Sequence, residues 1–139
     1  MWRILAFACF AFAYLRSERH IWEAATYERI RAERLAAHTD QADYFSKTIR
    51  IHVPVTTHAS AWMYCAERSY RMQPGEAWAL NNSTVHGVWN ADPERSRTHL
   101  ICDFLTSPAL IDLLARAERD LGTVEASVYE RVYALQPTA

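Results

Sequence analysis

His38 and Asp40 are separated by one position, and both have side chains that bind metal ions. On an extended strand, residues at i and i+2 point to the same face, so an imidazole and a carboxylate at this spacing can meet at one ion. Two ligands make only half a site. A distal histidine that completed a set of two histidines and one carboxylate would leave open positions on iron(II) for a co-substrate and dioxygen.

A strand pattern begins at Thr48, where apolar residues alternate with other residues. This period of two predicts a strand with two different faces, one of which carries Arg50, His52 and Pro54. The apolar face consists of Ile49, Ile51, Val53 and Val55. Shorter strands are predicted at 62–65, 77–80, 85–89 and 99–105, with Pro74-Gly75 and Ala91-Asp92-Pro93 as turns between them. Several short strands in succession favour a sandwich or a barrel.

Helix signals occur at both ends of this β-rich region. Residues 20–37 are rich in Glu, Arg and Ala and have good local helix propensity. Ser107-Pro108 forms a suitable helix start and Gly122 a suitable end, and a second helix is predicted over 124–135. Apolar residues on these C-terminal helices should pack against the sheet or a partner subunit. They are Leu110, Leu113, Leu114, Ala117 and Leu121.

Composition limits the function classes. The chain has 139 residues, half of them hydrophobic, which fits one domain over 1–139. The net charge of -1 predicts binding to neither nucleic acid nor an anionic membrane, and the three glycines leave no phosphate-binding loop. Cys9, Cys65 and Cys102 lie far apart, so we expect neither disulfides nor a zinc site, and a cytoplasmic location. The apolar run at 2–15 is more consistent with a buried element than with a signal peptide.

Five sequence blocks occur in an order that is more specific than any one of them. They are His38-Thr39-Asp40, Arg50-Ile51-His52-Val53-Pro54-Val55-Thr56, Pro74-Gly75-Glu76-Ala77-Trp78, His86-Gly87-Val88-Trp89-Asn90 and Arg97-Thr98-His99-Leu100-Ile101-Cys102-Asp103. This order resembles the aspartyl/asparaginyl β-hydroxylase-like oxygenases over about 27–105, and most of all their bacterial branch that contains free-proline hydroxylases.

The resemblance implies a metal site and a co-substrate site. It places His38, Asp40 and His86 on the iron(II) ligands and Arg97 on the residue that holds the distal carboxylate of 2-oxoglutarate. Arg50 and His52 fall on positions that line the same pocket.

Physical chemistry agrees with these assignments, because an arginine fork pairs with a carboxylate through two hydrogen bonds and stays charged. The alternatives are an ion pair of Arg97 with Asp103 or Glu94, and indirect roles for His52 and Arg50. His99 remains a candidate for the pocket wall, Trp78 is assigned to the core, and Trp89 is open between core and pocket. His20 and His58 have no assigned role.

The expected fold is therefore mainly β, a double-stranded β-helix (jelly roll, cupin-like) with a barrel core over about 27–105 and C-terminal helices over 108–135. The resemblance requires a strand that leads to the metal, so we expect a strand from about Arg29 onward in spite of the local helix propensity. Only 37 residues precede His38, and Arg34-Leu35-Ala36-Ala37 lacks the turn residues often found before the motif. The substrate-facing wall could then be shortened or supplied by another subunit.

The expected function is a 2-oxoglutarate-dependent dioxygenase that hydroxylates a small amino acid or similar metabolite, with Arg68 and Arg71 as candidates for a substrate carboxylate. Hydroxylation of Asp or Asn residues in peptides or proteins is one alternative. A non-catalytic, cupin-like metal-binding or small-molecule-binding module is another, and an inactive fragment a third. Any homo-oligomer is expected to form through the C-terminal helices.

Overall fold

The computed structural model describes residues 1–5, 22–31, 34–41 and 43–134. Its elements, in chain order, are β1 (Trp2–Leu5), β2 (Trp22–Arg31), β3 (Arg34–His38), the short 3-10 helix η1 (Asp43–Ser46), β4 (Thr48–Thr56), β5 (Ala61–Cys65), β6 (Arg68–Tyr70), β7 (Glu76–Leu80), β8 (His86–Asn90), β9 (Ser96–Leu105), α2 (Pro108–Ala115), β10 (Glu118–Arg119) and α3 (Ala126–Tyr133). Within the described part of the chain, no helix has the length and apolar content needed to cross a membrane.

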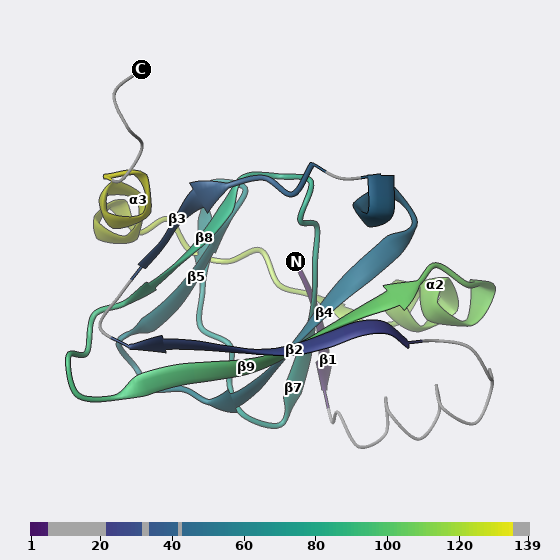
Figure 1. Cartoon of the computed structure of the whole chain (residues 1–139), viewed down its shortest axis with the longest axis horizontal. Coiled ribbons are helices and arrows are strands. Elements are labelled where there is room, and N and C mark those ends of the chain that lie inside the picture. Colours follow the sequence, from purple (N-terminus) through teal and green to yellow (C-terminus); the bar gives the residue numbers. More distant parts are fainter. Residues whose placement is uncertain (6–21, 32–33, 42, 135–139) are drawn as a thin grey trace.

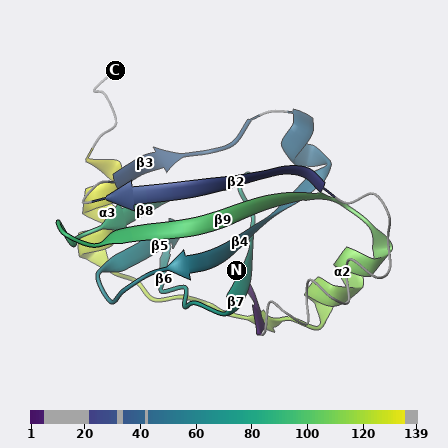
Figure 2. The same cartoon turned by 60° about the horizontal axis from the view of Figure 1, so that its bottom comes forward.

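The strands form two antiparallel sheets that face each other, as in a jelly roll (Figures 1 and 2). The larger sheet has the order β10-β1-β7-β4-β9-β2, and the smaller sheet has the order β3-β8-β5-β6. In Figure 1, α3 lies on the outer side of the smaller sheet, and α2 lies at the far end of the larger one. The predicted fold class, mainly β with C-terminal helices, is confirmed.

Alternation along β4 and β9 gives this part of the larger sheet one apolar and one polar face. Ile51 and Val53 are buried in a cluster with residues of β7, β9 and α2. Arg50 and His52 belong to the opposite face, where Arg50 is paired in register with Asp103 of β9. The predicted two-faced strand is therefore present, although Val55 near its end is 48% exposed.

Three buried clusters hold the layers together. The first lies between the larger sheet and α2, and it includes Leu110, which is fully buried. The second lies between the two sheets around Trp78, as predicted for that residue. The third lies between the smaller sheet and α3, where Tyr64, Val128 and Val132 are buried. Each sheet thus has apolar contacts on both sides.

The N-terminal prediction of a helix over 20–37 was wrong. Residues 22–31 and 34–38 are strands, and β2 pairs with β9 while β3 pairs with β8. Pairing to strands far along the chain overrides local helix propensity here. The choice of a strand from Arg29 onward was correct, although β2 already begins at Trp22. His20 and most of the apolar run at 2–15 lie outside the described residues.

The C-terminal helices are shorter than predicted. Ser107 caps α2 by accepting a hydrogen bond from the Leu110 N–H, with Pro108 in the first turn, but the helix ends at Ala115 rather than near Gly122. The following residues form β10, which pairs with β1. Gly122 lies between β10 and α3 with φ +63°. Leu121 is 68% exposed, so Leu121 does not join the apolar stripe.

Two turns that precede strands contain residues with positive φ angles. Gly75 has φ +89°, a conformation that glycine adopts without strain, and it lies in the predicted Pro74-Gly75 turn before β7. The turn between β5 and β6 has Ala66 and Glu67 at positive φ. No glycine or asparagine marks this turn, and β6 was not among the predicted strands.

Candidate metal centre

The side chains of His38, Asp40 and His86 meet at one point. His38 ends β3 and His86 begins β8, and the two residues are paired across these strands. Asp40 follows two residues after His38, and the ligand atoms of all three lie within 4.8 Å of one another. The two imidazole rings have centroids 4.3 Å apart. The structure therefore brings together the three residues that the sequence predicts as ligands.

Hydrogen bonds to main-chain carbonyls orient both imidazoles. His38 Nδ1 lies 2.8 Å from the carbonyl oxygen of Ala36, and His86 Nδ1 lies 2.9 Å from that of Thr84. A carbonyl oxygen only accepts, so each Nδ1 carries a proton, and the tautomer that this selects has its lone pair on Nε2. These Nε2 atoms lie 3.8 and 4.0 Å from carboxylate oxygens of Asp40. Burial lowers the pKa of His86, which favours the neutral, metal-binding form.

Two donors hold the Asp40 carboxylate. Arg50 Nη1 donates to Oδ2 at 2.7 Å, and Asn82 Nδ2 donates to the same oxygen at 3.1 Å. The main chain is also fixed, because the Asp40 N–H donates to the Asn82 carbonyl at 3.1 Å. Asn82 was missed by the sequence analysis. An asparagine in a turn between strands gives no signal of a partner 42 positions away.

The Arg50 fork is engaged by Asp103. Arg50 Nε and Nη2 donate to the two carboxylate oxygens of Asp103 at 2.8 and 2.9 Å, and Phe45 stacks 4.7 Å from the guanidinium. Hydrogen bonding to Asp103 raises the pKa of Arg50, so it is always charged. Asp103, considered above as a partner of Arg97, thus pairs with Arg50. The two N–H groups that could bind a co-substrate carboxylate side by side already donate to Asp103. A role of Arg50 toward a co-substrate stays a prediction.

A second polar group, made by Arg97, His99 and His52, lies deeper on the same face of β4 and β9. These residues are 2, 1 and 3% exposed. Arg97 Nη2 lies 2.8 Å from His99 Nδ1, which must accept because a guanidinium only donates, so a neutral His99 carries its proton on Nε2. Among the described residues, neither His99 Nε2 nor either ring nitrogen of His52 has a hydrogen-bond partner.

These buried groups fit an anionic, carboxylate-bearing molecule. Burial lowers the pKa of His52 and of His99, with the charge of Arg97 as the next cause for both. Both rings are therefore neutral, and each can donate one hydrogen bond beside the fixed positive charge of Arg97. Buried polar atoms without partners are costly, so this donor set is suited to bind an oxygen-rich ligand. His99, an open candidate in the sequence, belongs to this group.

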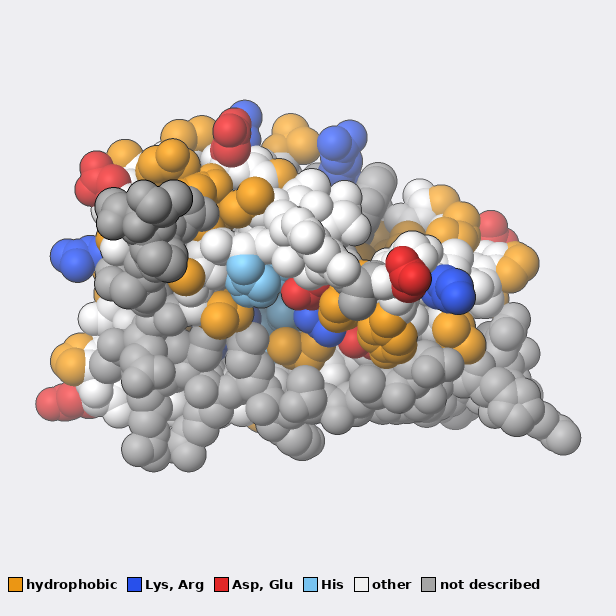
Figure 3. All heavy atoms as spheres, turned by 45° about the horizontal axis from the view of Figure 1, so that its top comes forward, with side chains coloured by type: hydrophobic (Ala, Val, Ile, Leu, Met, Phe, Trp, Pro, Cys, Tyr) orange, Lys and Arg blue, Asp and Glu red, His pale blue; other side chains and the backbone are white. Residues whose placement is uncertain are grey.

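The metal centre is open on one side. The His38 side chain is 37% exposed, whereas His86 and Asp40 are 5 and 15% exposed. Figure 3 shows pale blue histidine side chains at the surface of this face, bordered by acidic and basic side chains. A molecule can therefore approach the centre from solvent on the His38 side.

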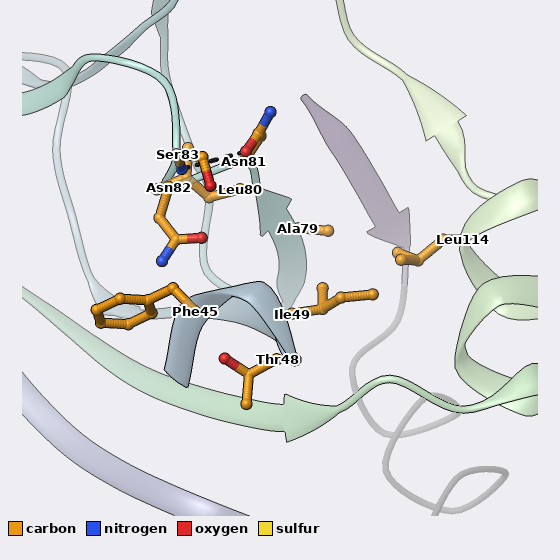
Figure 4. Close-up of a pocket in the computed structure, with 9 residues that line it drawn as sticks. All are labelled: Phe45, Thr48, Ile49, Ala79, Leu80, Asn81, Asn82, Ser83 and Leu114. Atoms are coloured by element: carbon orange, nitrogen blue, oxygen red, sulfur yellow. Dashed lines mark hydrogen bonds between the residues drawn. The ribbon is translucent and has the colours of Figure 1, made fainter. Parts of the chain in front are cut away.

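A cavity of about 210 Å³ lies next to the site, behind Asn82. Asn82 and Phe45 lie at one end of it and Leu114 at the other (Figure 4). The remaining lining residues are Thr48, Ile49, Ala79, Leu80, Asn81 and Ser83. Since Asn82 contacts Asp40 and Phe45 contacts Arg50, these two side chains separate the cavity from the metal ligands.

The structure does not bring Arg71 to the metal centre. Arg71 stacks 3.8 Å from the ring of Trp62 and donates to the Ala59 carbonyl, beside a different cavity of about 490 Å³. Arg68 is exposed on β6, two strands away from His86. A role of Arg68 or Arg71 in binding a substrate carboxylate stays a prediction.

Trp89, which the sequence left open, packs against the cluster between the smaller sheet and α3. It lies on the outer side of β8, away from the group of Arg97, His99 and His52.

Comparison with known proteins agrees with the motif order. A family model described as aspartyl/asparaginyl beta-hydroxylase matches residues 10–107, which is well over half of the chain. Among solved structures, the chain is similar to one described as a non-heme monooxygenase, ThoJ–nickel complex, with 18% sequence identity and a TM-score of 0.49. That match covers 64% of this chain and 46% of the other, so this chain spans about half its length. A search of curated proteins gives no match. The chain belongs to the aspartyl/asparaginyl β-hydroxylase family.

Proposed function

We propose that the protein is an Fe(II)- and 2-oxoglutarate-dependent dioxygenase that hydroxylates a small amino acid or an amino-acid-like metabolite. The observation that carries the proposal is the convergence of two Nε2 atoms and one carboxylate within 4.8 Å. Two histidines and one carboxylate on one side of an ion are typical of non-haem Fe(II) oxygenases, which need open positions for co-substrate and oxygen. The solvent-accessible side at His38 fits this requirement.

Each residue of the site has a defined task in this proposal. His38, His86 and Asp40 would hold the metal, and Arg50 and Asn82 keep the carboxylate in place. Bound iron, with dioxygen and 2-oxoglutarate, would supply the oxidising chemistry. Arg97 would bind the distal carboxylate of 2-oxoglutarate, while His52 and His99 offer neutral N–H donors in the same buried region. Their burial excludes water from the co-substrate.

The decisive experiment is anaerobic addition of iron(II) and 2-oxoglutarate to the metal-free protein, watching for the visible charge-transfer band of the chelate. We expect the band in the wild type and in His58→Ala, a histidine outside the site. We expect no band in His86→Ala, which removes one of three protein ligands. Absence of the band in the wild type, or its persistence in His86→Ala, would refute the assignment.

The co-substrate role of Arg97 can be tested in the same assay. Arg97→Lys keeps the charge but loses the fork, so it should need a higher 2-oxoglutarate concentration while its affinity for the metal alone stays unchanged. Hydrogen bonds to charged groups contribute about 1.5–3 kcal/mol each, which corresponds to roughly a 10- to 150-fold increase. Equal 2-oxoglutarate requirements would make Arg97 structural. The melting temperature of each variant provides the folding control.

A small amino acid is the first candidate for the substrate. A small substrate is supported by the likeness of the sequence blocks to the free-proline hydroxylase branch. The description of the matched family favours Asp or Asn side chains in peptides as the second candidate. A screen for succinate release coupled to hydroxylated product should include free amino acids and Asp- or Asn-containing peptides. Hydroxylation of peptides alone would replace the first candidate by the second.

A further inference from the structure

The loop that connects β7 to β8 is tightly folded on itself. The Thr84 N–H and hydroxyl both donate to the Asn81 carbonyl, at 3.2 and 2.7 Å, and the Ser83 N–H donates to Asn81 Oδ1 at 3.2 Å. Asn81 is exposed, whereas Asn82 is only 4% exposed and faces the metal ligands. A loop held by its own hydrogen bonds can support other groups at fixed positions.

This loop contacts two of the three predicted metal ligands. The Thr84 carbonyl accepts from His86 Nδ1 at 2.9 Å. Asn82 contacts Asp40 twice, through its carbonyl, which accepts from the Asp40 N–H, and through its side-chain amide, which donates to Asp40 Oδ2. Asp40 lies beyond the end of β3, where no strand pairing fixes it. The contacts from Asn82 take the place of that pairing.

We propose that Asn82 is a positioning residue that fixes the Asp40 carboxylate for metal binding through one oxygen, an inference that rests on the proposed function. Arg50 and Asn82 both donate to Oδ2. Oδ1 lies 3.8 Å from His38 Nε2, and Oδ2 lies 4.0 Å from His86 Nε2. Because Oδ2 already accepts both of these hydrogen bonds, Oδ1 is the oxygen assigned to the cation. Binding through a single oxygen keeps one more position on the ion open for other ligands. Asn82 thereby controls both the affinity of the site and its coordination number.

The test compares alanine substitutions at two neighbouring residues of the loop. Asn82→Ala removes the amide donor, while Ser83→Ala changes an exposed side chain of the same loop and keeps the main-chain N–H that bonds Asn81 Oδ1. Nickel(II) is titrated into each metal-free protein by calorimetry, so the measurement does not depend on turnover. Loss of a group that orients a metal ligand typically costs 10- to 100-fold in affinity. We expect a loss of roughly this size for Asn82→Ala and less than a twofold change for Ser83→Ala.

A spectroscopic measurement separates positioning from mere support of the fold. In the cobalt(II) form, a carboxylate that turns to bind through both oxygens raises the coordination number and weakens the visible absorption bands. We expect weaker bands in Asn82→Ala than in the wild type. Asn82→Leu is the second variant, because it removes the amide donor and keeps a side chain of similar volume beside Phe45 at that end of the cavity.

The outcomes distinguish this inference from the proposed function. Wild-type protein that binds neither nickel(II) nor cobalt(II) would overturn both. Wild-type binding together with unchanged affinity and unchanged cobalt(II) bands in Asn82→Ala and Asn82→Leu would overturn the positioning role alone. Weaker binding and altered bands, with wild-type melting temperature of the metal-free protein, would establish it.

Discussion

Replacing Arg50 by Gln should destabilise the metal-free protein strongly, because two carboxylates then lose their shared cation. Arg50 makes three charge-assisted hydrogen bonds of 2.7, 2.8 and 2.9 Å, one to Asp40 and two to Asp103. The side chains of Arg50, Asp40 and Asp103 are 19, 15 and 6% exposed, so water screens them only in part. Breaking a buried pair from one side costs about 3–5 kcal/mol. We expect a loss in unfolding free energy of about 3 kcal/mol, at the lower end because the pair is incompletely buried.

Urea denaturation at neutral pH measures this loss, and a double-mutant cycle assigns it. Asp103→Asn removes the charge that Arg50 neutralises, so the double variant should lose less than the sum of the two single variants. A coupling of about 1–3 kcal/mol is expected for residues in direct contact. A loss below about 1 kcal/mol in Arg50→Gln, typical of exposed ion pairs, would refute the view that this pair is shielded from solvent.

Three further predictions concern packing, pH and capping. Gly87→Ala should destabilise the fold by about 1–3 kcal/mol and weaken metal binding, because the added Cβ would lie 2.9 Å from the Leu35 carbonyl oxygen and push β3 away from β8. Unchanged nickel(II) affinity in a calorimetric titration would contradict this expectation. Burial holds the folded-state pKa values of His52 and His99 below 6.5, so below that pH the unfolded state binds more protons than the folded state. The unfolding free energy at pH 5.5 should therefore be about 1.4 kcal/mol per histidine lower than at pH 7.5. His99→Asn should reduce this difference, as measured by urea titrations at the two pH values. Ser107→Ala should cost about 1 kcal/mol in urea denaturation by removing the α2 cap, and Ser107→Asp should restore it.

The sequence predicts those parts of the fold in which local pattern and tertiary environment agree. In β4, the alternation of Ile51 and Val53 with Arg50 and His52 matches the buried and polar faces of the sheet. The resemblance carried by the motif blocks assigned His86 to the same set as His38 and Asp40, and the pairing of β3 with β8 brings these side chains together.

Local pattern fails where distant partners decide the structure. Residues 22–31 have helix-forming composition but form a strand because β9 offers a complete pairing edge. The segment after Ala115 leaves the helix because β10 pairs with β1, where Arg3 also bonds Glu118 at 2.7 Å. The contact of Asn82 with Asp40 is of the same kind, since it depends on how two loops meet rather than on either sequence.

The position of α3 has a consequence for local opening of the structure. This eight-residue helix is too short to be stable alone, and it is ordered by burying Val128 and Val132 completely against the back of the smaller sheet. Conversely, Ala37 and Tyr64 of that sheet are covered by α3. Helix and sheet should therefore exchange their amide hydrogens as one cooperative unit. The hydrogen-exchange protection of β3 and β8, which carry the two histidines, would then change together with that of α3, although α3 contributes no ligand.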